Sequence, residues 1–188
     1  MNVPTIVLIT GHPGTGKTTL AEALAQELKL PLTCRDQFKE TLLDTLGYST
    51  EEWANRLSVA SWTLLYQQIE RLLFANVDQI VESNFDPKYA NPKWARLRQQ
   101  YSFQLIQIRC ETSAEILIAR YRERIANKRR HPGHVDRSDD AAFLKLIRQG
   151  PMDWIDIEGE RLTVDTNVLD KENYQIIATA VRRFMILT

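Results

Sequence analysis

Apolar and polar residues follow one another along the chain in a pattern that separates strand-like from helix-like segments. An apolar run such as that at 3–9 is typical of a strand buried on both faces, and shorter segments rich in Val, Ile and Leu indicate further strands. We expect strands at residues 3–10, 32–34, 77–83, 103–110 and 161–165. Apolar residues at helical spacing occupy the intervals, so we expect helices at 15–30, 36–46, 50–74, 87–100, 112–124, 138–150 and 170–188. Strands alternating with helices predict a parallel sheet in a three-layer α/β/α architecture.

Helix-start and helix-stop signals place several of these boundaries. Ser49 followed by Glu52 forms a capping-box pattern, and Thr112 followed by Glu115 forms another. Pro92 is expected to interrupt or begin the helix within 87–100. The helix that opens at Ser138 is expected to stop before Pro151.

The segment between the first strand and the first helix is a complete phosphate-binding loop of the Walker A type. Its backbone N–H groups can wrap phosphate oxygens, and the helix that follows adds its positive dipole end. We expect Lys17 to reach the β and γ phosphates and the Thr18 hydroxyl to bind Mg²⁺. His12 is expected to turn its side chain outward. The residues expected to contact the nucleotide are Gly11, His12, Pro13, Gly14, Thr15, Gly16, Lys17, Thr18 and Thr19.

Length and charge limit the remaining possibilities. The 188 residues fit a single domain, 1–188, and the 24 basic and 24 acidic residues cancel. The chain therefore has no overall basic footprint for duplex DNA or an anionic membrane. No leader pattern or apolar run of bilayer length occurs, so we expect a cytoplasmic protein without a membrane partner. Cys34 and Cys110 are too few for a disulfide framework, and we expect both to be buried thiols.

Candidate chemistry is expected where strands end, because ligands of open α/β sheets lie beyond the carboxyl ends of the strands. Asp36 follows the second strand, where a carboxylate can accept the proton of an attacking hydroxyl, and Lys39 one turn later can hold an anionic group. Alternatively, Asp36 only caps its helix, although both roles are compatible. Asn127 and Lys128 lack the Asp that guanine-specific proteins place two residues later, and residues 80–84 hold one carboxylate rather than a motor-type acidic pair. A small phosphotransferase fits these features best.

A basic segment follows the fourth strand. Arg120 and Arg124 stand four residues apart and so lie on one helix face. We expect a lid at about 120–137 whose guanidinium groups close over the nucleotide. For the tip, 128–130, a solvated basic face is an equal alternative.

These motifs in their order resemble the P-loop kinases. The resemblance rests on the phosphate loop, on Asp-x-x-Lys at 36–39, on Val-Glu-Ser-Asn-Phe at 81–85, on the arginine pair with His-Pro-Gly-His at 131–134, and on Val-Asp-Thr at 164–166. It is nearest to chloramphenicol phosphotransferase, the zeta toxins, 5′-hydroxyl polynucleotide kinase domains and "predicted kinase" proteins with an AAA-type ATP-binding domain. It spans nearly the whole chain and implies a five-stranded sheet of order 2-3-1-4-5, the cofactors ATP and Mg²⁺, and transfer of the γ-phosphoryl group to a hydroxyl.

The resemblance also implies roles for single residues. Asp36 matches the acceptor-side base, and Lys39 stands where polynucleotide kinases often have Arg, so the bidentate fork for a substrate phosphate is missing. Arg120 resembles a lid residue that stacks on adenine, and Arg124 one that touches phosphates. Thr166 resembles part of the loop beside the base.

Glu82 and Asn84 have an open assignment. The resemblance implies that Glu82 helps to hold Mg²⁺ or orients the acceptor, with Ser83 and Asn84 assisting. The alternative is an ordinary strand-terminal Glu paired with a lysine.

Aromatic and histidine residues carry weaker signals. Trp53, Trp62 and Tyr66 are expected in the core rather than in an acceptor pocket. His131 and His134 are expected to form hydrogen bonds in the lid rather than a metal site.

The main functional hypothesis is an ATP- and Mg²⁺-dependent kinase of a small-molecule hydroxyl. The alternatives are a 5′-hydroxyl polynucleotide kinase, which the balanced charge makes a weaker fit, and a non-catalytic ATP-binding switch module. The sequence indicates no oligomeric state.

Overall fold

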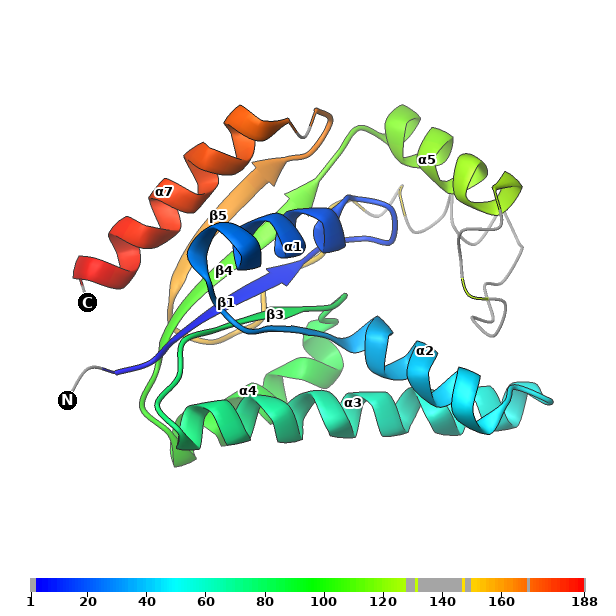
Figure 1. Ribbon diagram of the computed structural model, residues 1–188, viewed down its shortest axis with the longest axis horizontal. Helices are drawn as coiled ribbons and strands as arrows, with labels where there is room; N and C mark the ends of the chain where they lie inside the picture. The colour runs from blue at the N-terminus through cyan, green and yellow to red at the C-terminus, as the bar shows by residue number, and fades with distance from the viewer. Residues whose placement is uncertain (1–2, 128–130, 132–146, 148–149, 169, 188) are drawn as a thin grey trace.

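A five-stranded parallel sheet forms the centre of the molecule (Figure 1). The computed structural model describes residues 3–127, 131, 147, 150–168 and 170–187, with the side chains of 121, 124–126 and 187 excepted. The strands are β1 (Thr5–Thr10), β2 (Leu32–Cys34), β3 (Gln79–Glu82), β4 (Gln104–Glu111) and β5 (Glu160–Asp165). They stand in the order β2-β3-β1-β4-β5, and all neighbours are parallel. The predicted α/β class and strand order are confirmed.

Helices cover both faces of the sheet (Figure 1). They are α1 (Lys17–Leu28), α2 (Arg35–Leu46), α3 (Glu51–Phe74), α4 (Pro87–Gln100), α5 (Ala114–Ala126) and α7 (Lys171–Leu187). The helix predicted at 138–150 lies almost wholly outside the described residues, as does the predicted lid beyond Asn127, apart from His131.

Two apolar clusters hold the helices on the sheet. On one face, strand residues such as Val7 and Ile9 pack with α1 and α7 through Leu24 and Val181. On the other face, β1, β3 and β4 pack with α3, α4 and Ile155. Because strands such as β1 contribute side chains to both clusters, they are buried throughout, which explains their unbroken apolar sequence.

Two predicted helix starts are wrong by one residue. Thr50, not Ser49, caps α3: its hydroxyl accepts a hydrogen bond from the Trp53 N–H at 3.1 Å. Ser113, not Thr112, lies before α5, and its hydroxyl accepts from the backbone N–H three residues later at 3.4 Å. In both helices a second hydroxyl residue stands beside the expected one, so the capping oxygen can come from either position.

Pro92 neither interrupts nor begins α4, contrary to the prediction. Pro92 lies inside the helix, which begins at Pro87. Asp86 caps this start by accepting a hydrogen bond from the Lys88 N–H at 2.9 Å. Pro92 sits one turn into the helix, where its missing N–H removes only one intrahelical bond.

The three aromatic residues expected in the core lie at its margin, where each is partly buried. Trp62 and Tyr66 of α3 pack against the apolar cluster that α3 and α4 form with the sheet. Trp53 packs against a small cluster formed by Leu43, Ala54 and Leu57 of α2 and α3. Both cysteines are buried and free. Among the described helices, none combines the length and apolar character that a membrane crossing requires.

Candidate active site

The phosphate loop runs from the end of β1 to the start of α1, and its shape depends on glycine. Gly11 has φ +144, and a Cβ added there would lie 2.5 Å from the carbonyl oxygen of Cys110. Gly16 occupies the cap position of α1 with φ +81, a left-handed conformation that L side chains rarely adopt. The loop therefore passes close to β4 and turns directly into the N-terminus of α1.

The carbonyl of His12 gathers three donors inside this loop. It accepts from the Thr15 hydroxyl at 2.8 Å, from the Thr15 N–H at 3.3 Å and from Lys17 Nζ at 3.1 Å. The expected outward position of the His12 side chain is wrong: the ring is partly buried, and its Nε2 lies 2.7 Å from the carbonyl oxygen of Gly150. The ring nitrogen donates this bond and so ties the loop to the segment before β5.

Thr18 and Glu82 meet at the carboxyl end of β3. The Thr18 hydroxyl donates to Glu82 Oε2 at 3.2 Å, and only 4% of Glu82 is exposed. Burial raises the pKa of the Glu82 carboxyl and the charge of Asp36 adds to this, while Lys17 and hydrogen bonds from Thr18 and Cys34 act in the opposite direction. The Thr18 hydroxyl oxygen and the Glu82 carboxylate oxygens thus lie together beside the phosphate loop.

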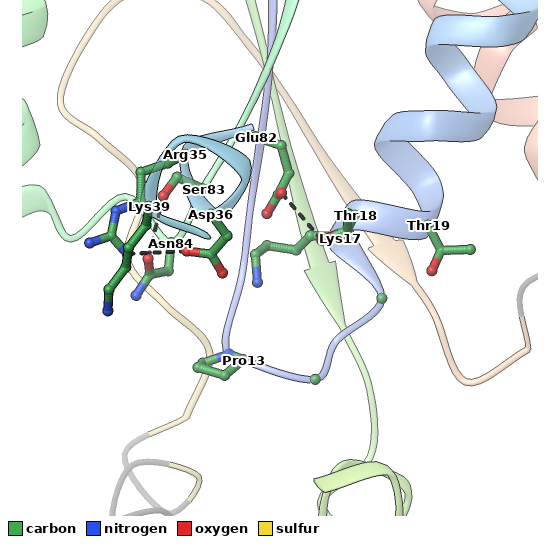
Figure 2. A pocket seen from close by; sticks show the side chains of 12 residues that line it. Pro13, Lys17, Thr18, Thr19, Arg35, Asp36, Lys39, Glu82, Ser83 and Asn84 are labelled. Carbon is green, nitrogen blue, oxygen red and sulfur yellow. Dashed lines mark hydrogen bonds and ion pairs between the residues drawn. The ribbon is translucent and has the colours of Figure 1, made fainter. Parts of the chain in front are cut away.

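Asp36 and Lys39 face the same space from α2. This helix begins directly after β2, so residues one turn apart at its start stand above the carboxyl ends of the strands. Figure 2 shows Lys17 and Asp36 extending into the space between the loop and α2. One pocket of about 140 Å³ is lined by Pro13, Gly14, Gly16, Lys17, Thr18, Thr19, Arg35, Asp36, Lys39, Glu82, Ser83 and Asn84.

The alternative that Asp36 caps its helix is wrong. α2 begins at Arg35, and the cap position belongs to Cys34, which makes no side-chain cap bond. Asp36 lies within the first turn, and its Oδ1 accepts from Arg35 Nη1 at 3.1 Å. Asp36 is therefore not the cap residue of its own helix.

Arg35 is a site residue that the sequence reasoning missed. It lines the pocket and is buried, with contacts to α3. Its position between a buried strand and Asp36 is visible in the sequence, but its partners on α3 lie more than twenty residues away.

The residues expected near the base of the nucleotide form a separate group. Arg120 Nη2 donates to the carbonyls of Thr166 at 2.8 Å and Asn167 at 3.3 Å, which joins α5 to the loop after β5. The Thr166 hydroxyl and N–H both donate to the Glu111 carbonyl, each at 2.7 Å. Arg124 belongs to α5, but its side chain is outside the described set.

His131 reaches back to α2. Its Nε2 lies 2.8 Å from Asp44 Oδ1, and its ring meets the edge of Tyr48 at 5.6 Å between centroids. His134 lies outside the described residues. Within the described ranges, no three His, Cys, Asp or Glu residues are grouped as metal ligands.

Comparison with known proteins places this geometry in a family. Residues 6–148 match a family described as an AAA domain. A candidate kinase from Chloroflexus aurantiacus j-10-fl shares 38% sequence identity and a TM-score of 0.89, and the match covers 96% of this chain and 98% of that one. No curated protein matches the chain significantly.

More distant structures share the fold alone. A gluconokinase from Sinorhizobium meliloti 1021 is 17% identical with a TM-score of 0.54. The match covers 98% of this chain and 94% of the gluconokinase chain. The Mycobacterium tuberculosis APS kinase CysC, in complex with AMPPNP and APS, is 16% identical with a TM-score of 0.57. The match covers 97% of this chain and 99% of that one. With its phosphate loop, strand order and these matches, the chain belongs to the AAA domain family and has a P-loop kinase-like fold.

Proposed function

We propose that this protein is an ATP- and Mg²⁺-dependent phosphotransferase that acts on a hydroxyl group of a small molecule. The observation that carries the proposal is one pocket in which the phosphate loop faces Asp36 and Lys39. A pocket of about 140 Å³ is smaller than the roughly 300–1,000 Å³ of typical ligand sites, so it suits phosphoryl groups and a compact acceptor.

The donor half of the pocket consists of Lys17, the loop amides, Thr18 and Glu82. Lys17 and the amides contact the β and γ phosphates. The Thr18 hydroxyl and Glu82 carboxylate fit Mg²⁺, because that ion takes one or two protein oxygens together with substrate phosphates. When bound, Mg²⁺ supplies neutralising charge to the phosphate oxygens.

The acceptor half consists of Asp36, Lys39 and Asn84. The Asp36 carboxylate accepts the proton of the acceptor hydroxyl as that oxygen forms its bond to the γ phosphorus. The bond between the γ phosphorus and the bridging oxygen breaks, and ADP leaves with its electrons. Lys39 contacts an anionic group of the acceptor, and Asn84 hydrogen-bonds a polar one.

The roles of the residues near the adenine base follow from the resemblance. Arg120 lies against the adenine, Thr166 lies beside it, and Arg124 contacts phosphates. The hydrogen bonds of Arg120 with the loop after β5 support this placement, since they hold α5 against the strand end where the base would lie.

Label transfer from γ-³²P-ATP tests the proposal. The acceptor panel contains gluconate, APS, neutral and anionic small alcohols, and a 5′-hydroxyl oligonucleotide. We expect transfer to a small alcohol, and we expect Asp36→Asn to reduce it by about 10²- to 10⁴-fold with ATP affinity nearly unchanged. Glu52→Gln is the matched control, because this carboxylate is exposed on α3 and pairs only with Arg56 within the described residues.

Three results would contradict the proposal in whole or in part. Full activity of Asp36→Asn would remove its carboxylate from the chemistry. Transfer only to the oligonucleotide, with steep salt dependence, would identify a 5′-end kinase. Tight ATP binding without transfer to any acceptor would identify a binding switch.

A further inference from the structure

Arg35 is a buried cation at the acceptor end of the pocket to which the proposed reaction assigns no step. It is the first residue of α2, and about 10% of its side chain is exposed. Removing a guanidinium from water is costly unless hydrogen bonds and an opposite charge replace its hydration. The partners that compensate for this burial connect Arg35 to Asp36.

The guanidinium is held from two helices. Arg35 Nη1 donates to Asp36 Oδ1 at 3.1 Å, and Nη2 donates to the Ser58 hydroxyl and, at 3.5 Å, to the Ser58 carbonyl. Its central carbon lies 5.1 Å from the ring centroid of Trp62, within cation–π range. Adjacent positions on a helix do not face each other, so the contact with Asp36 requires the long Arg35 side chain to curl, and α3 fixes that curl.

The supporting residues on α3 are themselves fixed. Ser58 and Trp62 are one helical turn apart and so share a face. The Trp62 ring is stacked with Tyr66 at 6.2 Å between centroids and lies 5.6 Å from the ring of Phe85 in an edge contact, so it packs against the apolar cluster to which Phe85 belongs. A chain of contacts thus runs from the rigid core through Trp62 and Arg35 to Asp36.

The Asp36 carboxylate needs such support for chemistry rather than for folding. About 59% of its side chain is exposed, and an ion pair with so exposed a partner contributes little to stability. A proton acceptor, however, must be held within hydrogen-bond reach of the reacting hydroxyl, and a displacement of about 1 Å can lower a rate about 10²-fold.

We propose that Arg35 is a positioning residue that orients the Asp36 carboxylate for proton acceptance, with Ser58 and Trp62 orienting Arg35. This inference rests on the proposed phosphotransferase function. Lysine cannot replace Arg35, since an ammonium lacks the planar fork that reaches Asp36 and Ser58 together.

Steady-state kinetics of Arg35→Lys test the inference, with the acceptor that the panel identifies and with water as a second acceptor. We expect kcat to fall roughly 10- to 100-fold while KM for ATP and the melting temperature stay near the values of the unchanged protein. The same substitution in an Asp36→Asn background should cause little further loss. Guanidinium at low concentration should partly restore Arg35→Gly. Arg56→Lys, an exposed arginine on α3, is the matched control.

Ser58→Ala keeps the test decisive if the Arg35 variants do not fold. It removes one hydrogen bond and should lower kcat several-fold without changing ATP affinity. The inference would be overturned if the kcat losses of Arg35→Lys and Asp36→Asn multiplied in the variant that carries both. Unchanged kcat in both Arg35→Lys and Ser58→Ala would overturn it as well. If no acceptor in the panel receives phosphate, the proposed function fails. If transfer occurs and Asp36→Asn retains it in full, the function stands and the inference fails, so the two failures are distinguishable.

Discussion

The two halves of the pocket are built in different ways. Apart from Glu82, the phosphate side consists of one continuous stretch, residues 11–18, whose main-chain groups and glycine conformations form the cradle. The acceptor side is assembled from the start of α2 and the residues after β3, with support from α3, and it depends on side chains such as Arg35 and Ser58 that are far apart in sequence. A contiguous backbone site can be recognised from its sequence, whereas a site made of side chains from several elements requires the fold.

Replacing the loop lysine should have the largest effect on ATP binding and should act on the phosphate side alone. Lys17→Ala removes the cation aimed at the β and γ phosphates, and we expect transfer to fall about 10²- to 10³-fold with much weaker binding of ATP. Calorimetry with ATP and Mg²⁺ measures the binding. Lys29→Ala, at the exposed far end of α1, is the control. Unchanged ATP affinity in Lys17→Ala would contradict the assignment of this loop.

Glu82→Gln should separate ion binding from nucleotide binding. The Mg²⁺ concentration for half-maximal activity should rise roughly 10- to 100-fold because a charged oxygen ligand is lost. A Mg²⁺ titration at saturating ATP measures this shift. An unchanged titration would show that Glu82 does not bind the ion and serves only the structure at the end of β3.

Gly11→Ala should test how tightly the loop packs on β4. The added Cβ would meet the Cys110 carbonyl oxygen at 2.5 Å, and φ +144 disfavours an L side chain, so we expect a loss of about 1–3 kcal/mol in the free energy of unfolding. Gly47→Ala is the matched control, because its φ is also positive but nothing lies within 4 Å. Denaturant unfolding compares the two, and an equal loss in both would assign the effect to backbone strain alone.

The smallest effect is expected from a thiol beneath the loop. Burial raises the pKa of Cys110 to about 12, against 9.0 for an ordinary thiol. Above pH 9 the unfolded thiol loses its proton and the native one does not, so the free energy of unfolding falls as pH rises toward 12. We expect the slope to flatten by at most about 1.4 kcal/mol per pH unit in Cys110→Ala. Denaturant unfolding between pH 8 and about 10.5 measures it, and parallel curves would show that this thiol does not titrate as expected.

The sequence predicted features that depend on local pattern. Apolar runs located the strands, and the glycines around Lys17 located the phosphate cradle. Helix caps were misplaced at Thr50 and Ser113 because two adjacent residues could each provide the oxygen. The order of the strands came from the resemblance, since periodicity alone does not say which strands pair.

The acceptor side was predicted only in part. The position of Asp36 after β2 was enough to place it at the site, but its supposed capping role was wrong because α2 starts one residue earlier. Arg35 escaped notice, since its burial comes from Ser58 and Trp62 on another helix. The outward turn expected for His12 failed for the same reason: its partner at Gly150 is 138 residues away.

β2 is an edge strand of three residues that pairs with β3 alone and leads straight into α2. The helix bearing Asp36 is thus attached at the margin of the sheet, while the nucleotide loop is rooted in its centre at β1. Under the proposed function, the acceptor side would change at this margin of the sheet while the phosphate loop keeps its place on β1.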